Sequence, residues 1–133
     1  MPPTILVAPG PYKECLTAHE VAAAMQQGIA DIVPEATVIL RPLSDGGSGL
    51  SRLLVEATGG RTVRLDVRHP LEGNISSSYG ILGDGLTAVV ESATACGLAL
   101  VSKDRRNPLD TTTYGVGQLI RHAVESSGAR KVI

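Results

Sequence analysis

Three short segments of this sequence combine charged or hydroxyl side chains with glycines, which are the residue types that bind small anions. Lys13 follows the first apolar run and offers a positive charge to an anionic ligand, although a solvated surface lysine fits this position equally well. In residues 44–49, Asp45 precedes Gly46 and Gly47, and such glycines let the backbone approach a ligand closely. Asp45 could bind a hydroxyl group or a magnesium ion, or it could only stabilise a tight turn that has no ligand.

The third segment, residues 110–117, leads into a predicted helix. Thr112, Thr113, Gly115 and Gly117 place hydroxyl groups and accessible backbone at the start of that helix, where the N–H groups favour an anion. Threonine at this location also serves simply as a helix cap. The segment is therefore either an anion site or a cap.

Glu91 ends an apolar run, and an acid in that position is costly to bury without a partner. It lies either at the exposed end of a strand or at a site. Residues 44–49 match neither a Walker A loop nor a dinucleotide fingerprint, because no Gly-Lys-Ser/Thr follows. His19, His69 and His122 share no metal-ligand spacing and are expected at the surface, so no metal ligands are assigned.

Strands and helices must alternate to position these residues. A capping box at Thr17 and Glu20 starts a helix whose apolar residues recur at helical spacing. Between residues 61 and 91 the period changes to strict alternation, which is typical of antiparallel strands joined by a turn at residues 83–85. Strands are expected at 5–8, 37–42, 61–67, 75–82, 87–91 and 131–133, and helices at 17–32, about 50–58 and 113–126.

This order predicts an α/β fold, with a Rossmann-like parallel sheet, flanking helices and an antiparallel β extension. Residues 5–8, 38–40 and the C-terminal strand are expected to lie parallel in one sheet. Residues 1–60 and 108–133 would then form the Rossmann-like part, and residues 61–107 the β extension.

The composition excludes several classes of protein. The net charge is −1, with 12 basic and 13 acidic residues, so no electrostatic footprint for nucleic acid or an anionic membrane is expected. The first apolar run is too short for a signal peptide or a membrane span. Cys15 and Cys96 match no metal spacing and are expected to be buried free thiols in the cytoplasm. With no Phe and no Trp, the core must be built from Val, Leu, Ile and Ala.

Several blocks occur in a distinctive order along almost the whole chain. They include Ile5-Leu6-Val7-Ala8-Pro9, Lys13-Glu14-Cys15-Leu16-Thr17-Ala18, Asp45-Gly46-Gly47-Ser48-Gly49, Ala57-Thr58-Gly59-Gly60, Thr87-Ala88-Val89-Val90-Glu91, and Asn107-Pro108-Leu109 with Thr112-Thr113-Tyr114-Gly115-Val116-Gly117. In this succession the chain resembles the N-terminal part of the class I glycerate kinases, which phosphorylate D-glycerate at O2.

The resemblance implies ATP and Mg²⁺ as cofactors and a small hydroxy acid as the substrate. It implies catalytic roles for Lys13 and Asp45, and it implies that the remaining candidate residues bind substrate. Two positions depart from the family pattern, because Gly10 stands where an acid is usual and Ser48 replaces a Glu. The substrate-binding set is Gly46, Gly47, Glu91, Thr112, Thr113, Gly115 and Gly117.

Family members are far longer, so the chain is expected to be incomplete and inactive as a kinase on its own. It is also expected to self-associate or to associate with a missing C-terminal part. Two other interpretations stay open: a degenerate kinase-like module that binds a small ligand, and a structural fragment that assembles with itself or with a second chain.

Overall fold

The computed structural model describes residues 1–12 and 15–133. The chain divides into two compact units, Met1–Leu53 and Leu54–Ile133. Among the described residues, no helix is both long and apolar enough to cross a membrane.

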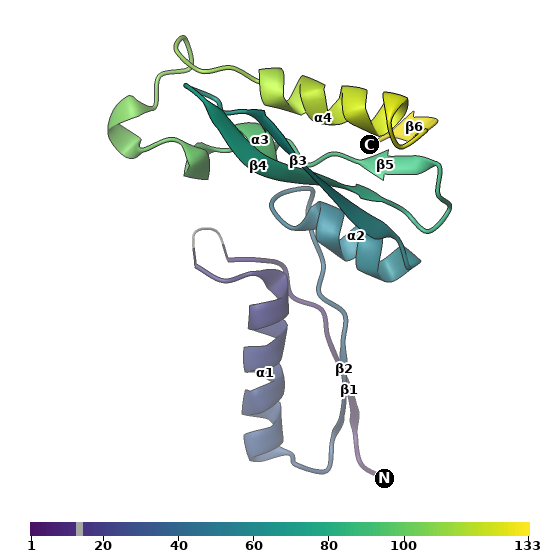
Figure 1. Ribbon diagram of the computed structural model, residues 1–133. Helices are drawn as coiled ribbons and strands as arrows, with labels where there is room; N and C mark the ends of the chain where they lie inside the picture. The colour runs from purple at the N-terminus through teal and green to yellow at the C-terminus, as the bar shows by residue number, and fades with distance from the viewer. Residues whose placement is uncertain (13–14) are drawn as a thin grey trace. The chain divides into compact units, whose positions relative to one another are not determined.

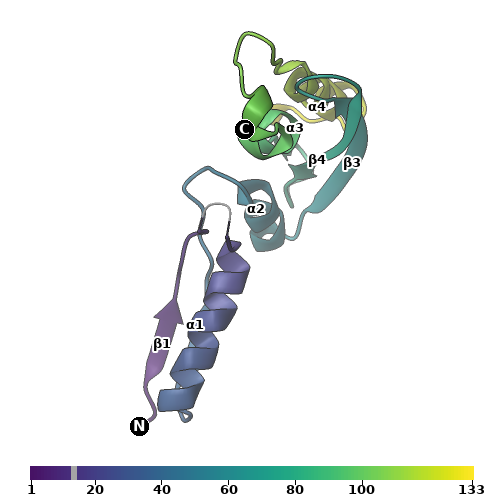
Figure 2. The same ribbon diagram turned by 90° about the vertical axis from the view of Figure 1, so that its left-hand side faces the viewer.

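The first unit is a β–α–β element. Strand β1 (Thr4–Val7) pairs in parallel with β2 (Thr37–Leu40), so that Leu6 lies beside Ile39. Helix α1 (Ala18–Ile32) connects the strands and lies along them (Figures 1 and 2). The predicted capping box at its start is confirmed.

The core of this unit is small. Val7, Ala18, Val21 and Ala22 are its buried apolar residues among those described, whereas the helix residue Met25 is 46% exposed. In the described part of the chain the sheet has two strands. Parallel sheets are normally covered on both faces, so this unit exposes more apolar surface than is usual.

The second unit contains a mixed sheet whose strand order, within the described residues, is β3-β4-β5-β6. The β3–β4 and β4–β5 pairs are antiparallel, as the alternating sequence predicts, and β5–β6 is parallel. The strands are β3 (Arg61–Arg68), β4 (Asn74–Ile81), β5 (Thr87–Val89) and β6 (Lys131–Val132).

One expectation about the sheets is wrong. The C-terminal strand β6 pairs with β5, and not with β1 or β2, so these three strands do not form one parallel sheet. Periodicity identified the strand, but it carries no information on which partner the strand hydrogen-bonds. The grouping of residues 1–60 with 108–133 stays a prediction.

Helix α4 (Tyr114–Glu125) packs on β3 and β4 (Figure 1), and α3 (Ala93–Cys96) packs on β4 and α4. Helix α2 (Leu50–Thr58) ends at Gly59, where φ is 67°, as the glycine pair predicts. Two short 3-10 turns, Leu98–Leu100 and Lys103–Arg105, follow α3. The buried core of this unit consists of Val67, Tyr79, Ile81, Ala88, Ala95, Leu119, Ala123 and Ala129.

Candidate functional site

The turn that precedes α2 carries Asp45, Gly46 and Gly47, all exposed. The N–H of Gly47 donates to Asp45 Oδ1 at 3.2 Å, and the N–H of Gly46 donates to Ser44 Oγ at 3.2 Å. Gly46 has φ 99°, a conformation that a residue with a side chain rarely adopts. Two amide donors of this turn thus bind the turn's own side chains, and an incoming anion would compete with them.

Lys13, the predicted catalytic cation, lies outside the described residues. Its neighbours Tyr12 and Leu16 exchange backbone hydrogen bonds, from Tyr12 N to Leu16 O at 2.9 Å and from Leu16 N to Tyr12 O at 3.0 Å. The role assigned to Lys13 stays a prediction.

In the second unit, Thr112 and Thr113 immediately precede α4. The Thr112 amide donates to Pro70 O at 2.9 Å, which ties the segment to the β3–β4 turn. The Thr112 hydroxyl accepts from the amide of Tyr114 at 3.1 Å, whereas Thr113 is exposed and its side chain makes no capping hydrogen bond. Local capping therefore accounts for Thr112, and it does not account for the hydroxyl of Thr113.

The two glycines of α4 lie in different surroundings. Gly115 is buried, and a Cβ at this position would lie 2.4 Å from Arg68 O and 3.5 Å from the Cβ of Ala95. Gly117 is exposed, and a Cβ there would meet nothing within 4 Å. Packing of the helix on β3 is a sufficient reason for glycine at 115, and it gives no reason for glycine at 117.

Glu91 is buried, with 9% of its surface exposed, so it does not lie at an exposed strand end. Its carbonyl accepts from Thr94 N at 3.1 Å and from Thr94 Oγ1 at 2.8 Å, which starts the turn into α3. Ala95 of α3 in turn packs beside Gly115 of α4. Two of the predicted site segments therefore lie on neighbouring elements of the second unit.

A groove of about 650 Å³ runs along α4 and includes Thr113 and Gly117 in its lining. Its charged residues include Asp66 and the exposed pair Arg121 and Glu125, whose Nε and Oε2 atoms lie 2.8 Å apart. The hydrogen bond that Arg121 donates to the Glu125 carboxylate raises the pKa of Arg121 above its usual value. The groove has the mixed charge and apolar lining that suits a small polar molecule better than a long polyanion.

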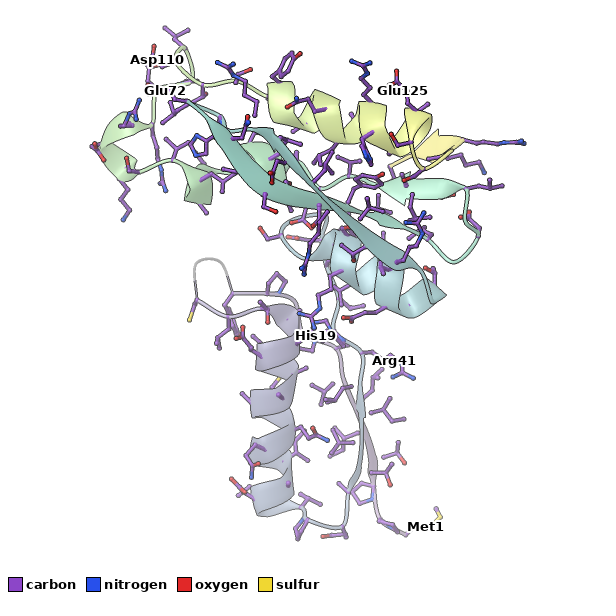
Figure 3. The ribbon with its side chains drawn as sticks, viewed as in Figure 1. Met1, His19, Arg41, Glu72, Asp110 and Glu125 are labelled. Carbon is purple, nitrogen blue, oxygen red and sulfur yellow. The ribbon has the colours of Figure 1, made fainter. Side chains whose placement is uncertain are left out.

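A second cavity, of about 550 Å³, lies where the β3–β4 turn meets the loop that precedes α4. Glu72 and Asp110 are on this side of the unit (Figure 3). Glu72 forms an ion pair with Arg105 at 3.1 Å. Within the described residues no three His, Cys, Asp or Glu side chains are grouped in a way that could hold a metal ion.

The expectation of surface histidines is wrong in its detail. All three histidines are half-buried, and His69 bonds Leu100 O at 3.1 Å through Nε2. His122 Nδ1 lies 2.8 Å from the hydroxyl of Tyr79, which also lies 2.6 Å from Ser127 Oγ. No sequence signal indicated this network, because its members are 43 and 48 residues apart along the chain.

The expectation of buried thiols is also wrong for one cysteine. Both cysteines are free, but Cys15 is exposed and Cys96 is half-buried. Cys15 lies ahead of α1 and outside any helix or strand, and residues in such connecting positions are usually at the surface.

The fold and its loops thus define an α/β protein with two clusters of candidate ligand-binding residues, one in each unit. The structure groups Asp45, Gly46 and Gly47 in the first unit, and it groups Glu91 with the start of α4 in the second.

Comparison with known proteins gives the family. The family model described as the glycerate kinase family matches residues 5–133. Glycerate 2-kinase of Escherichia coli is 44% identical over 129 residues, which are 97% of this chain and 34% of that protein. Glycerate kinase of Haemophilus influenzae is 44% identical over 120 residues, which are 90% of this chain and 32% of that protein.

A solved structure agrees with these matches. A protein described as glycerate kinase 2 from Salmonella typhimurium LT2 is 43% identical and superposes with a TM-score of 0.73, over 99% of this chain and 35% of its own. The chain belongs to the glycerate kinase family. It spans about a third of the length of the relatives that it matches.

Proposed function

We propose that this chain forms the acceptor-binding part of a glycerate kinase, which binds D-glycerate and presents its O2 hydroxyl for phosphorylation. The observation that carries the proposal is the family match over residues 5–133, because every candidate site residue falls inside it. The relatives named as glycerate kinases and as a glycerate 2-kinase support the substrate and the position of phosphorylation.

Each cluster has a role in this proposal. Lys13 pairs with the carboxylate of glycerate, a charge-assisted contact worth about 1.5–3 kcal/mol. Asp45 binds either a hydroxyl group of the substrate or a magnesium ion. The exposed hydroxyl of Thr113 and the backbone around Gly117 offer hydrogen-bonding groups to the substrate.

ATP and Mg²⁺ are proposed as cofactors because the chain belongs to the glycerate kinase family. Mg²⁺ is commonly held by one or two protein carboxylates together with phosphate oxygens, and the single carboxylate of Asp45 fits such a role. ATP supplies the phosphoryl group, and this chain's own residues position the acceptor and neutralise its charge. Because the chain spans about a third of its relatives, we expect it to bind the acceptor without transferring phosphate alone. The proposal includes a cytoplasmic location, where ATP is available as the phosphoryl donor.

Calorimetry with D-glycerate tests the acceptor site. The wild-type chain should release heat on binding, and Lys13→Ala and Asp45→Ala should each weaken binding by roughly tenfold or more. Lys103→Ala and Asp31→Ala remove the same charges from exposed positions elsewhere and should bind like the wild type. Equal heats for all five proteins would remove Lys13 and Asp45 from the site.

A binding module without kinase activity is the second candidate. Gly10 and Ser48, both exposed, stand where the family pattern has acids, which favours altered chemistry in these two loops. Restoring the acids with Gly10→Asp and Ser48→Glu separates the two candidates. An increase in D-glycerate affinity when Mg²⁺ is added, in the double variant alone, would favour the binding module.

A further inference from the structure

The imidazole of His69 joins two separate turns of the second unit. Its Nδ1 atom accepts from the amide of Leu71 at 3.1 Å, and its Nε2 atom lies 3.1 Å from the carbonyl oxygen of Leu100. Leu71 belongs to the turn between β3 and β4, whereas Leu100 ends the first 3-10 turn after α3. The half-buried ring therefore bridges segments that are 31 residues apart along the chain.

The two partners determine where this ring carries its proton. A backbone amide can only donate, so Nδ1 must be free of a proton in order to accept from Leu71. A backbone carbonyl can only accept, so Nε2 must carry the proton that is donated to Leu100 O. His69 is thus neutral and in its Nε2–H tautomer. A charged ring would direct a second N–H at the amide of Leu71 and lose this contact.

The turn that this ring holds is itself bonded to the segment that precedes α4. Pro70 is fully buried between His69 and Leu71 in the sequence, and its carbonyl accepts from Thr112 N at 2.9 Å. The direction of this carbonyl depends on the peptide that follows it, whose amide belongs to Leu71 and is bound by the imidazole. A change at His69 would therefore move Thr112, and with it Thr113.

A second contact between the turn and the loop before α4 is weaker. Glu72 pairs with Arg105 at 3.1 Å, but their side chains are 83% and 51% exposed. Exposed ion pairs contribute little to stability, because solvent screens the charges. The imidazole contacts are partly buried. The ring, and not the ion pair, is therefore expected to fix the geometry of the turn.

We propose that His69 is a positioning residue for the acceptor site, whose neutral imidazole holds the β3–β4 turn so that Thr112 and Thr113 are placed for D-glycerate. This inference rests on the proposed function, because it concerns the same substrate. His69 acts through the Leu71 amide and the Pro70 carbonyl, and it needs no contact with the substrate. The hydrogen bond at Nδ1 sets the turn, and the one at Nε2 orients the ring.

Nitrogen NMR of the full chain, with ¹⁵N-labelled histidines, tests the protonation state. In the wild type at neutral pH, the His69 ring should show a protonated Nε2 and an unprotonated Nδ1. Its signals are assigned by their absence from His69→Asn. A proton on Nδ1, whether in the other tautomer or in the charged ring, would overturn the proposal.

Calorimetry with D-glycerate separates the two hydrogen bonds of the ring. His69→Asn retains an acceptor near Nδ1, because asparagine side chains accept from the amide two residues on, whereas His69→Gln retains only a donor near Nε2. The asparagine variant should bind within about twofold of the wild type, and His69→Gln and His69→Ala should bind roughly three- to tenfold more weakly. Glu72→Gln removes the exposed ion pair and should bind like the wild type.

Circular dichroism establishes that these variants are folded. Equal affinities of His69→Asn and His69→Gln, or an equal loss in Glu72→Gln, would overturn the proposal.

Amide chemical shifts without substrate distinguish this inference from the proposed function. The amide signals of Thr113 and Tyr114 should shift in His69→Gln and His69→Ala, and they should stay in place in His69→Asn. Shifts of equal size in the asparagine and glutamine variants would overturn the positioning role. The expected shifts without any heat from D-glycerate would support the role of His69 in placing this segment and would overturn the proposed function alone.

Discussion

Gly115 is the position at which the packing of α4 most clearly requires a glycine. A methyl group there would lie 2.4 Å from Arg68 O and 3.3 Å from Cγ2 of Val67, so α4 would have to move away from β3. We expect Gly115→Ala to lower the free energy of unfolding by about 1–3 kcal/mol, as overpacking does. Urea unfolding followed by circular dichroism measures the change.

Gly117 provides the matched control on the same helix. Its added methyl group would meet nothing within 4 Å, and alanine favours a helix over glycine by about 0.8–1 kcal/mol. Gly117→Ala should therefore leave stability unchanged or raise it. Similar losses at both positions would mean that helix packing is not the reason for Gly115.

Asp84 gives the fold a dependence on pH. Its carboxylate accepts from the Thr87 hydroxyl at 2.6 Å and from the amides of Leu86 and Thr87 at 2.9 and 2.8 Å. These hydrogen bonds, that of the Thr87 hydroxyl first, lower the pKa of Asp84 below its usual 3.8. A pKa lowered on folding stabilises the protein above the unfolded-state pKa, and this contribution is lost as the pH falls through the folded-state pKa.

The test is the unfolding midpoint as a function of pH for the wild type and for Asp84→Asn. The wild type should lose stability below about pH 4 more steeply than the variant, which cannot take up a proton at this position. Parallel curves would show that the turn at Asp84 does not couple folding to protonation.

At the scale of elements, α1 depends on its first turn. The amide of Thr17 donates to Glu20 Oε2 at 2.7 Å, and Glu20 N donates back to Thr17 Oγ1 at 3.3 Å. We expect Thr17→Ala to cost about 1 kcal/mol of stability and to reduce helicity. Gln26→Ala, at an exposed position inside the same helix, should change stability by less than about 0.5 kcal/mol. Circular dichroism during urea unfolding compares the two.

The elements also show what a sequence pattern can and cannot predict. The capping box at Thr17 and the alternation along β3 are local signals, and the structure confirms both elements. The partner of β6 depends on hydrogen bonds to a strand more than forty residues away, which no local pattern records. The short helix α3 was not predicted, because four residues are too few to show helical periodicity.

For the candidate site too, some features can be predicted from the sequence and others depend on packing. The glycine-rich turn at Asp45 and the helix start at Thr113 are visible as residue types at a loop. The burial of Glu91 and the steric reason for Gly115 depend on α3 and β3, which contact these positions only in three dimensions. The sequence alone therefore identifies the candidate loops. The three-dimensional packing shows which residues in these loops have a structural role.

At the scale of the whole molecule, the two units differ in how much apolar surface they bury. The first unit has a two-stranded sheet in its described residues, whereas the second has a core around Tyr79 and Leu119. We expect amides of β1 and β2 to exchange with deuterium faster than those of β3 and β4. Mass spectrometry of peptides from each strand measures this order. Uniform protection along the chain would contradict it.

The environment of Tyr79 has a consequence for spectroscopy. The chain has three tyrosines and no tryptophan, so its near-ultraviolet signal comes mainly from these three phenol rings. Tyr12 and Tyr114 are more than half exposed, whereas Tyr79 is fully buried, with its hydroxyl between His122 and Ser127. Near-ultraviolet dichroism, which requires a ring held in one asymmetric setting, should thus arise mainly from Tyr79. A single intrinsic chromophore then reports the packing of the second unit, without any label.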